Sequence, residues 1–304
     1  MKDLNRREVL VGLAGMPLLL AAGKSPSKTP VIRLSETPTA ANLSLGLNAL
    51  CTGKSSFLKE ELRPSDIVGI KLNCLAGRRL SPRPELVDSL VALLTEAGIK
   101  PSNIYVFDRS DRELVKAGFP LSPDGKGPRV VGINQDYEKE VSESGPVGSC
   151  YATLVTRTVT RLINVSVLKD HDLAGVSVGM KNFYGVIHNP NKYHMDACSP
   201  YVAHVVNHPS IRTKLVLTVI DASVAQYHGG PAYNPRYTWK EGAIYMARDP
   251  VALDAVGWDR IEKVRKEKGM ASLKAEKREP AYIAAAQALG LGTADLSAIE
   301  VVSL

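Results

Sequence analysis

Three lysines and two asparagines could together bind an anion: Lys71, Lys169, Lys181, Asn73 and Asn182. Several ammonium groups can neutralise one anionic ligand, and an asparagine amide offers a donor and an acceptor that fix its orientation. A carboxylate or a phosphate suits such a set. Lys181 also fits the exposed face of a helix, because apolar residues recur around it at helical spacing.

His171 follows Lys169 by two residues and adds a group that can transfer protons near neutral pH. In an enzyme, His171 would act as general acid or base while Lys169 and Lys181 stabilise developing negative charge. These three are the candidate catalytic residues.

Histidines gather in one part of the chain, since five of the six lie between residues 171 and 208. They are His171, His188, His194, His204 and His208. His204 and His208 are four residues apart and would share a helix face, where two imidazoles can bind one metal ion. We therefore predict a transition-metal site, of unidentified metal, made from these five histidines. The alternative is histidines hydrogen-bonded in a polar loop region.

Short apolar runs rich in β-branched residues must position these side chains, and such runs predict strands. The expected strands are 66–74, 103–108, 129–134, 161–169, 213–221, 242–248 and 298–304, and the expected helices are 84–99, 250–266 and 279–289. Strands that alternate with helices predict a three-layer α/β fold with a mostly parallel sheet flanked by helices.

Polar residues stand where these predicted strands end, and ligands of open α/β sheets bind beyond the carboxyl ends of the strands. Asp108 ends one strand and Asp221 another, so both join the candidate ligand-binding residues. Asp249 and Pro250 predict a helix start, because aspartate caps free N–H groups and proline suits the first helical position. Asp254, one turn further on, is a candidate that could face the ligand or the neighbouring loops.

The N-terminus has the pattern of an export signal: a charged head with Arg6 and Arg7, a short apolar run and small residues. The arginine pair favours the twin-arginine route. We predict a signal peptide over 1–23, a tether over 24–34 and a single α/β domain over 35–304. The protein would be periplasmic or otherwise extracytoplasmic. The export machinery would be a partner, with membrane contact only through an uncleaved signal.

The composition narrows the function further. The chain has 304 residues, 44% of them hydrophobic, and a formal net charge of +7, so it can bury a large core and favours acidic ligands. Nucleic acid is not expected as a partner, because basic residues are not interleaved with aromatic ones. Phosphate-loop and dinucleotide glycine motifs are absent from the sequence. The four scattered cysteines leave disulfides and free thiols open, and a built-in iron–sulfur cluster is not expected.

Four segments resemble the family of the domain of unknown function 362, in order over most of residues 40–260: "IVGIKLNCLAG", "VSVLKDHDLAGVSVGMKNFYGVI", "VIDASVAQYHGGPAYNP" and "ARDPVALDAVG". The family pattern is matched by Lys71 and Asn73, Lys169 and His171, Lys181 and Asn182, Gly230 and Pro231, and Asp249, Pro250 and Asp254. The family has no settled activity, so the resemblance implies an architecture and site positions. Some relatives carry a ferredoxin-like cluster segment, whose cysteine spacing this chain lacks.

The sequence thus predicts an exported protein whose Lys/Asn/His cleft binds a small anionic ligand together with a metal. It favours a metal-assisted or general acid/base enzyme of unassigned class. The alternative is a non-catalytic metal-binding or cofactor-binding redox accessory protein.

Overall fold

The computed structural model describes residues 28–53 and 55–304, so the predicted signal peptide lies outside the described residues. The strands are β1 Thr29–Ser35, β2 Val68–Leu72, β3 Ile104–Asp108, β4 Arg129–Gly132, β5 Ser142–Ser144, β6 Val147–Ser149, β7 Arg161–His171, β8 Gly175–Ser177, β9 Leu215–Gln226, β10 Thr238–Trp239, β11 Ala243–Ala247 and β12 Ile299–Ser303. The helices are α1 Ala40–Ala49, α2 Phe57–Glu61, α3 Pro84–Glu96, α4 Asp111–Ala117, α5 Tyr201–Asn207, α6 Pro209–Arg212, α7 Pro250–Glu267 and α8 Tyr282–Ala288. Two 3₁₀ segments, η4 Met180–Val186 and η5 Pro190–Tyr193, also matter for the site.

One large sheet organises the molecule, with the strand order β12-β1-β11-β9-β7-β2-β3-β4. Along this path only β11 is antiparallel to its neighbours, and the short β8 and β10 pair with β7 and β9. The sequence "RLINVSVLKDH" of β7 is buried from its second residue to its last. Such continuous burial is what a central parallel strand with both faces covered requires.

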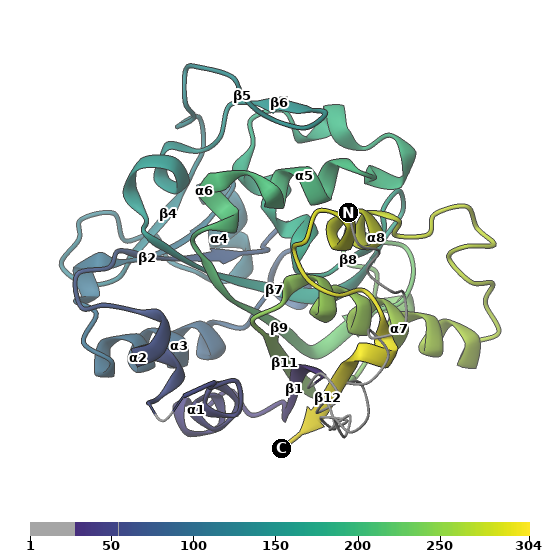
Figure 1. Ribbon diagram of the computed structural model, residues 1–304, viewed down its shortest axis with the longest axis horizontal. Helices are drawn as coiled ribbons and strands as arrows, with labels where there is room; N and C mark the ends of the chain where they lie inside the picture. Colours follow the sequence, from purple (N-terminus) through teal and green to yellow (C-terminus); the bar gives the residue numbers. More distant parts are fainter. Residues whose placement is uncertain (1–27, 54) are drawn as a thin grey trace, which may run out of the picture.

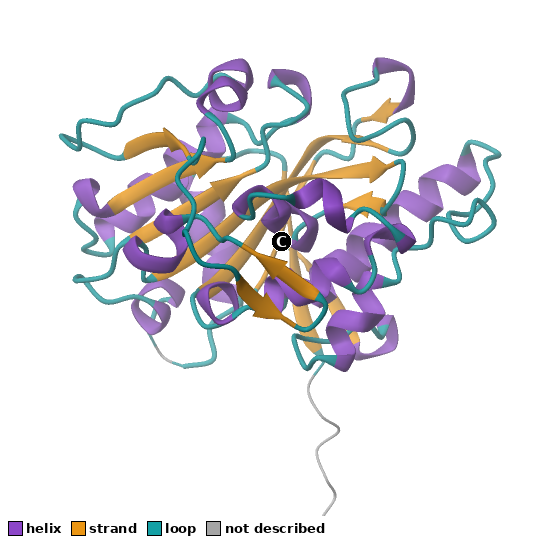
Figure 2. Cartoon of the chain, turned by 90° about the horizontal axis from the view of Figure 1, so that it is seen from above, coloured by secondary structure: helices purple, strands orange, loops and turns teal. Residues whose placement is uncertain are grey.

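Helices cover both faces of the sheet, which confirms the three-layer α/β fold (Figures 1 and 2). On one face, α1, α2 and α3 pack on a core that includes Ile32, Leu34 and Ile163. On the other face, α5, α7 and α8 pack on a core that includes Val31 and Leu162. Neighbouring residues of one strand thus enter different cores, as the two-residue period of a strand demands.

The predicted helix start at Asp249 is confirmed. Its side chain accepts hydrogen bonds from the backbone N–H groups of Val251 and Ala252, and Pro250 occupies the first position of α7. These bonds satisfy donors that the first helical turn leaves free.

The predicted tether over 24–34 is wrong from Thr29 onward, because Thr29–Ser35 forms β1 inside the sheet. Burial of Val31, Ile32 and Leu34 on alternating faces holds this segment in place.

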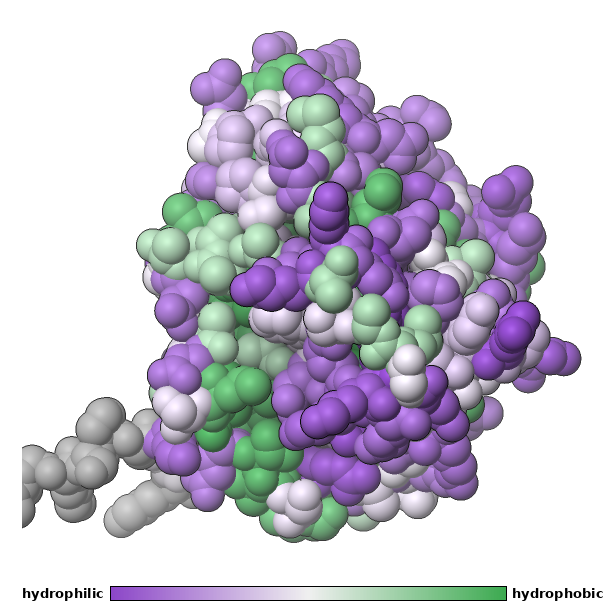
Figure 3. Space-filling view, turned by 90° about the vertical axis from the view of Figure 1, so that its right-hand side faces the viewer, coloured by the Kyte–Doolittle hydropathy of each residue, from purple (hydrophilic) through white to green (hydrophobic). Residues whose placement is uncertain are grey.

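In residues 28–53 and 55–304, none of the helices has both the length and the apolar character needed to span a membrane. The side of the molecule that lies to the right in Figure 1 is mostly hydrophilic, with one larger hydrophobic area (Figure 3).

Candidate functional site

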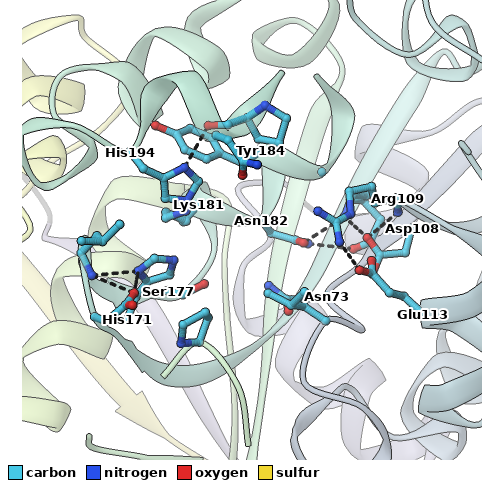
Figure 4. A pocket seen from close by; sticks show the side chains of 18 residues that line it. Asn73, Asp108, Arg109, Glu113, His171, Ser177, Lys181, Asn182, Tyr184 and His194 are labelled. Carbon is cyan, nitrogen blue, oxygen red and sulfur yellow. Dashed lines mark hydrogen bonds and ion pairs between the residues drawn. The ribbon is translucent and has the colours of Figure 1, made fainter. Parts of the chain in front are cut away.

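A cavity of about 510 Å³ opens where β2, β3 and β7 end, beneath η4 and η5. β2 lies between β3 and β7 and is parallel to both, so their carboxyl ends meet at one edge of the sheet. Figure 4 shows His171, Lys181, Tyr184 and His194 on one side of the cavity and Asp108, Arg109 and Glu113 on the other, with Asn73 and Asn182 between them.

Lys71 is fixed by three oxygen acceptors at the cavity wall. Its Nζ donates to Asp108 Oδ1 at 2.6 Å, to Asn182 Oδ1 at 2.9 Å and to the carbonyl of Leu72 at 2.6 Å. Both partners of the ion pair are buried. A Cβ at Gly185 would lie 2.9 Å from Lys71 Nζ, so a side chain there would require the lysine to shift away from its acceptors. Lys71 therefore serves as a compensated, structural charge.

Lys169 is buried, and none of the residues in 28–53 and 55–304 gives it a carboxylate partner. Its Nζ donates to Asn73 Oδ1 at 3.2 Å and to the carbonyl of Pro231 at 3.2 Å, just behind the residues that line the cavity. Burial, reinforced by repulsion from Lys181, lowers its pKa to about 8. Since Asn73 Oδ1 accepts from Lys169, the Asn73 amide nitrogen is left as a donor.

Lys181 lines the cavity, and within the described part of the chain it too has no carboxylate partner. Its Nζ lies 3.1 Å from His194 Nε2 and 4.2 Å from the ring centroid of Tyr184, a cation–π distance. Burial lowers its pKa to about 8. His194 Nδ1 lies 2.9 Å from the carbonyl of Pro190, so Nδ1 carries the proton and Nε2 accepts from the lysine.

His171 is a neutral hydrogen-bond donor toward the cavity. Backbone N–H groups of Leu173 and Ala174 point at its Nδ1 from 3.2 and 3.3 Å, which places the ring proton on Nε2. The mostly exposed carboxylate of Asp172, 3.0 Å from the same Nδ1, already accepts from the Leu173 amide. Burial, followed by repulsion from Lys181, lowers the His171 pKa to about 2.

An ion-pair network holds the end of β7 that carries Lys169 and His171. Arg278 donates to Asp170 Oδ1 at 2.6 Å and to the His171 carbonyl at 3.1 Å. The amide of Gly230 donates to Asp170 Oδ2 at 3.0 Å. A Cβ at Gly230 would lie 1.9 Å from the Asp170 carbonyl oxygen, so only glycine permits this approach. The predicted Gly230-Pro231 turn thus supports the site from behind.

Asp221 and Asp254 lie outside the cavity, which corrects their prediction as ligand-binding residues. Asp221 binds Arg83, with 2.8 Å from Oδ2 to Nε and 3.0 Å from Oδ1 to Nη2, because its position in β9 turns it toward α3. Asp254 accepts from the amides of Gly179 and Met180 and from the Tyr282 hydroxyl. Burial raises the pKa of Asp254 to about 7, although these bonds oppose the shift. Asp254 anchors the start of η4.

The structure brings together only two of the five histidines predicted to share a metal, which corrects the proposed ligand set. The rings of His171 and His194 stack with centroids 5.6 Å apart. His188 accepts from the Cys150 amide, and His208 bonds to Ser142. The ring of His204 lies against Gly145. Helix α5 ends at Asn207, so His204 and His208 do not share a continuous helix face.

Among the described residues, no group of three or more histidine, cysteine, aspartate or glutamate side chains is placed to hold a metal ion. His171 offers a protonated Nε2 to the cavity, and His194 Nε2 already accepts from Lys181. These side chains do not fit a resident metal as they stand. All four cysteines lie in the described ranges and are unpaired.

Several cavity residues were not predicted: Ser177, Tyr184, Arg109, Glu113 and Asp172. A signal existed for Ser177, since Gly175-Val-Ser177-Val-Gly179 has the Gly-x-Ser-x-Gly spacing of a nucleophile elbow. Ser177 instead ends the short strand β8, opposite Lys169, and its φ is not positive. Arg109 and Glu113 form an ion pair one helical turn apart. No strained elbow is built here.

The cavity therefore offers several donors: the Lys181 ammonium group, the Nε2–H of His171 and the amide of Asn73, with the Lys169 ammonium group directly behind Asn73. Such a set can bind an anion and can transfer protons between Lys181 and His194.

Comparisons with known proteins show similarity at the level of the family. The family model described as domain of unknown function (DUF362) matches residues 68–259. A comparison with curated proteins found no match. Among solved structures, a crystal structure of a protein from Thermotoga maritima is similar over 75% of this chain, with 10% identity and a TM-score of 0.43. The match covers 59% of that protein.

Proposed function

We propose, since this chain belongs to the family of the domain of unknown function DUF362, that its cavity binds a small anion, a carboxylate or a phosphate. The observation that carries the proposal is the pair Lys169 and Lys181: two buried ammonium groups at one cavity, neither with a carboxylate partner among the described residues. An uncompensated buried charge is costly, and a bound anion would remove that cost. The Nε2–H of His171 would add a neutral donor.

The same groups support an enzyme that uses acid/base chemistry. A lysine with a pKa of about 8 can give up its proton near neutral pH, and His194 Nε2 lies 3.1 Å from Lys181 Nζ to receive it. Lys169, held by Asn73 and Pro231, would remain as a fixed positive charge that stabilises an anionic transition state.

Malonate binding tests the proposal through its pH dependence. Affinity should fall as the pH rises above about 8, because the pKa values of Lys169 and Lys181 lie near 8 and only their charged forms attract the anion. The loss should be roughly tenfold per pH unit for each lysine that must be recharged. His171 stays neutral between pH 6 and 10, so affinity should not decrease toward pH 6. Calorimetric titration with malonate, and separately with inorganic phosphate, measures the affinity above pH 8 and toward pH 6.

Lys181→Arg is the matched control, because arginine keeps its charge throughout this range. Its malonate affinity should vary less steeply with pH than that of the unchanged protein. An affinity that weakens as the pH falls from 7 to 6, after correction for the protonation of the anion itself, would contradict the proposal. It would point instead to the predicted metal bound by histidines, because an imidazole must be neutral to be a metal ligand.

Export through the twin-arginine route is the second part of the proposal. It is supported by Arg6 and Arg7, the short apolar run and the small residues that follow. Changing both arginines to lysine should leave the precursor in the cytoplasm while total protein stays constant. Cell fractionation and immunoblotting follow the distribution, with Lys2→Arg as a control that preserves charge outside the pair. Periplasmic accumulation that is the same with and without the arginine pair would contradict this route.

A further inference from the structure

The three lysines near the cavity differ in what their ammonium groups already contact. Lys71 donates to three oxygen acceptors, one of them a carboxylate. Lys169 donates to an amide and a carbonyl and lies behind the lining residues. Lys181 has one hydrogen-bond partner in the described part of the chain, a ring nitrogen of His194, and its side chain lines the cavity. Lys181 is therefore the lysine whose nitrogen is most open to a bound molecule.

Its one partner is suited to remove a proton. His194 donates from Nδ1 to the Pro190 carbonyl at 2.9 Å, which leaves the Nε2 lone pair facing Lys181 Nζ at 3.1 Å. The ring of Tyr184, with its centroid 4.2 Å from the same Nζ, covers another side of the amine and keeps water from it. An amine with a base in contact and an apolar face beside it is the arrangement of a nucleophilic lysine.

We propose that Lys181 forms a Schiff base with a small 2-oxo acid, that is, a carboxylate with a carbonyl group on the adjacent carbon. The proposal rests on the anion site above and names its substrate class. The carboxylate would bind to the His171 Nε2–H and to the positive charge of Lys169, while the carbonyl carbon faces Lys181. Because His171 and His194 stack 5.6 Å apart at centroid, the anion site and the base of Lys181 are close enough for one small molecule to reach both.

The step balances without any other reactant. His194 Nε2 takes one proton from the Lys181 ammonium group, and the freed lone pair attacks the carbonyl carbon to form a C–N bond. A second nitrogen proton passes to the carbonyl oxygen, and the proton held by His194 completes a water molecule that leaves as the C–O bond breaks. The product is a protonated imine on Lys181 with the same net charge as the starting ammonium.

The ionisation of these groups agrees with this chemistry. Burial lowers the pKa of Lys181 to about 8, which gives a usable fraction of free amine near neutral pH. Burial and then Lys181 lower the pKa of His194, so its ring is neutral and ready to accept a proton. Repulsion between the two lysines is one of the causes, after burial, that lower the pKa of Lys169.

Reductive trapping tests the proposal directly. The mature protein is incubated with pyruvate and sodium cyanoborohydride, digested, and searched by mass spectrometry for a reduced pyruvate adduct. We expect about one adduct per chain, on the peptide that contains Lys181. Acetone, which has the carbonyl but no carboxylate, should label this lysine at least about tenfold less, because it cannot use the anion site.

Two variants make the result decisive. Lys181→Arg keeps the positive charge but has no nucleophilic amine, so the pyruvate adduct should disappear, while malonate binding is measured on the unchanged protein. Lys192→Arg changes an exposed lysine of the same segment and should leave the adduct unchanged. Malonate binding without any pyruvate adduct at Lys181 would overturn this inference and leave the anion site intact. Absence of malonate binding to the unchanged protein would instead overturn the proposed function itself.

Discussion

Replacing Lys169 with methionine should raise the free energy of unfolding at pH 7 by up to about 3 kcal/mol and abolish malonate binding. The side chain is completely buried, and its pKa falls from the ordinary 10.5 to about 8 because burial penalises the charge. Methionine has a similar length and no charge, so it removes that penalty. The gain of about 3 kcal/mol is an upper limit, because methionine cannot make the two hydrogen bonds that Lys169 donates to Asn73 and Pro231.

The pH dependence gives the same prediction an independent check. Between pH 8 and 10.5 the unfolded chain holds a proton on Lys169 that the folded chain has released, so stability rises with pH over this range. Lys169→Met should show a smaller rise, and its advantage should shrink by pH 10. Urea denaturation at pH 7 and pH 10 measures both effects, with the exposed Lys192→Met as control. A variant destabilised at both pH values would show that the Lys169 charge is compensated in the folded protein.

Replacing Asp108 with alanine should have the opposite effect and cost about 3 to 5 kcal/mol of folding free energy. The carboxylate accepts from Lys71 Nζ at 2.6 Å and from the backbone amides of Cys74 and Arg109, each at 2.7 Å. Alanine would leave a buried ammonium group without its counter-charge and two amides without acceptors. Chemical denaturation at pH 7 measures the loss, and Asp124→Ala, at an exposed loop position, is the control.

A double variant separates charge from hydrogen bonding at this pair. Lys71→Met combined with Asp108→Asn removes both charges and keeps one acceptor oxygen, which can serve only one of the two amides, because Cys74 donates to Oδ2 and Arg109 to Oδ1. We expect it to recover a large part of the stability lost in Asp108→Ala, because no unpaired charge remains. If Asp108→Ala alone costs less than about 1 kcal/mol of folding free energy, Asp108 is not what compensates the buried charge of Lys71.

The local elements of this protein were largely predictable from the sequence. Apolar runs predicted β2, β3, β7 and β9 to within a few residues, because a buried parallel strand needs continuous β-branched or aliphatic residues, and they also predicted the edge strand β12. Asp249 and Pro250 predicted the start of α7 for an equally local reason, the free N–H groups of a first helical turn. β1 was missed because its few apolar residues follow a proline-rich and polar stretch.

The placement of Lys71 and Asn73 at the cavity, with Lys169 directly behind Asn73, also had a sequence basis, since parallel strands end at the same edge of a sheet. What each charged group does there depended on its partner, and partners come from distant parts of the chain. Asp108 neutralises Lys71 across 37 positions, whereas Lys169 and Lys181 have no carboxylate partner in the described structure.

Only the tertiary structure decided the fate of Asp221, Asp254 and the histidines. Asp221 forms an ion pair with Arg83, which is distant in the sequence, and Asp254 accepts hydrogen bonds from the amides at the start of η4. His204 and His208 looked like neighbours on a helix, but the helix ends between them. Strand positions follow from local apolar patterns, which neighbouring residues carry. Charge states and side-chain partners follow from burial and long-range contacts, which the chain acquires only when it folds.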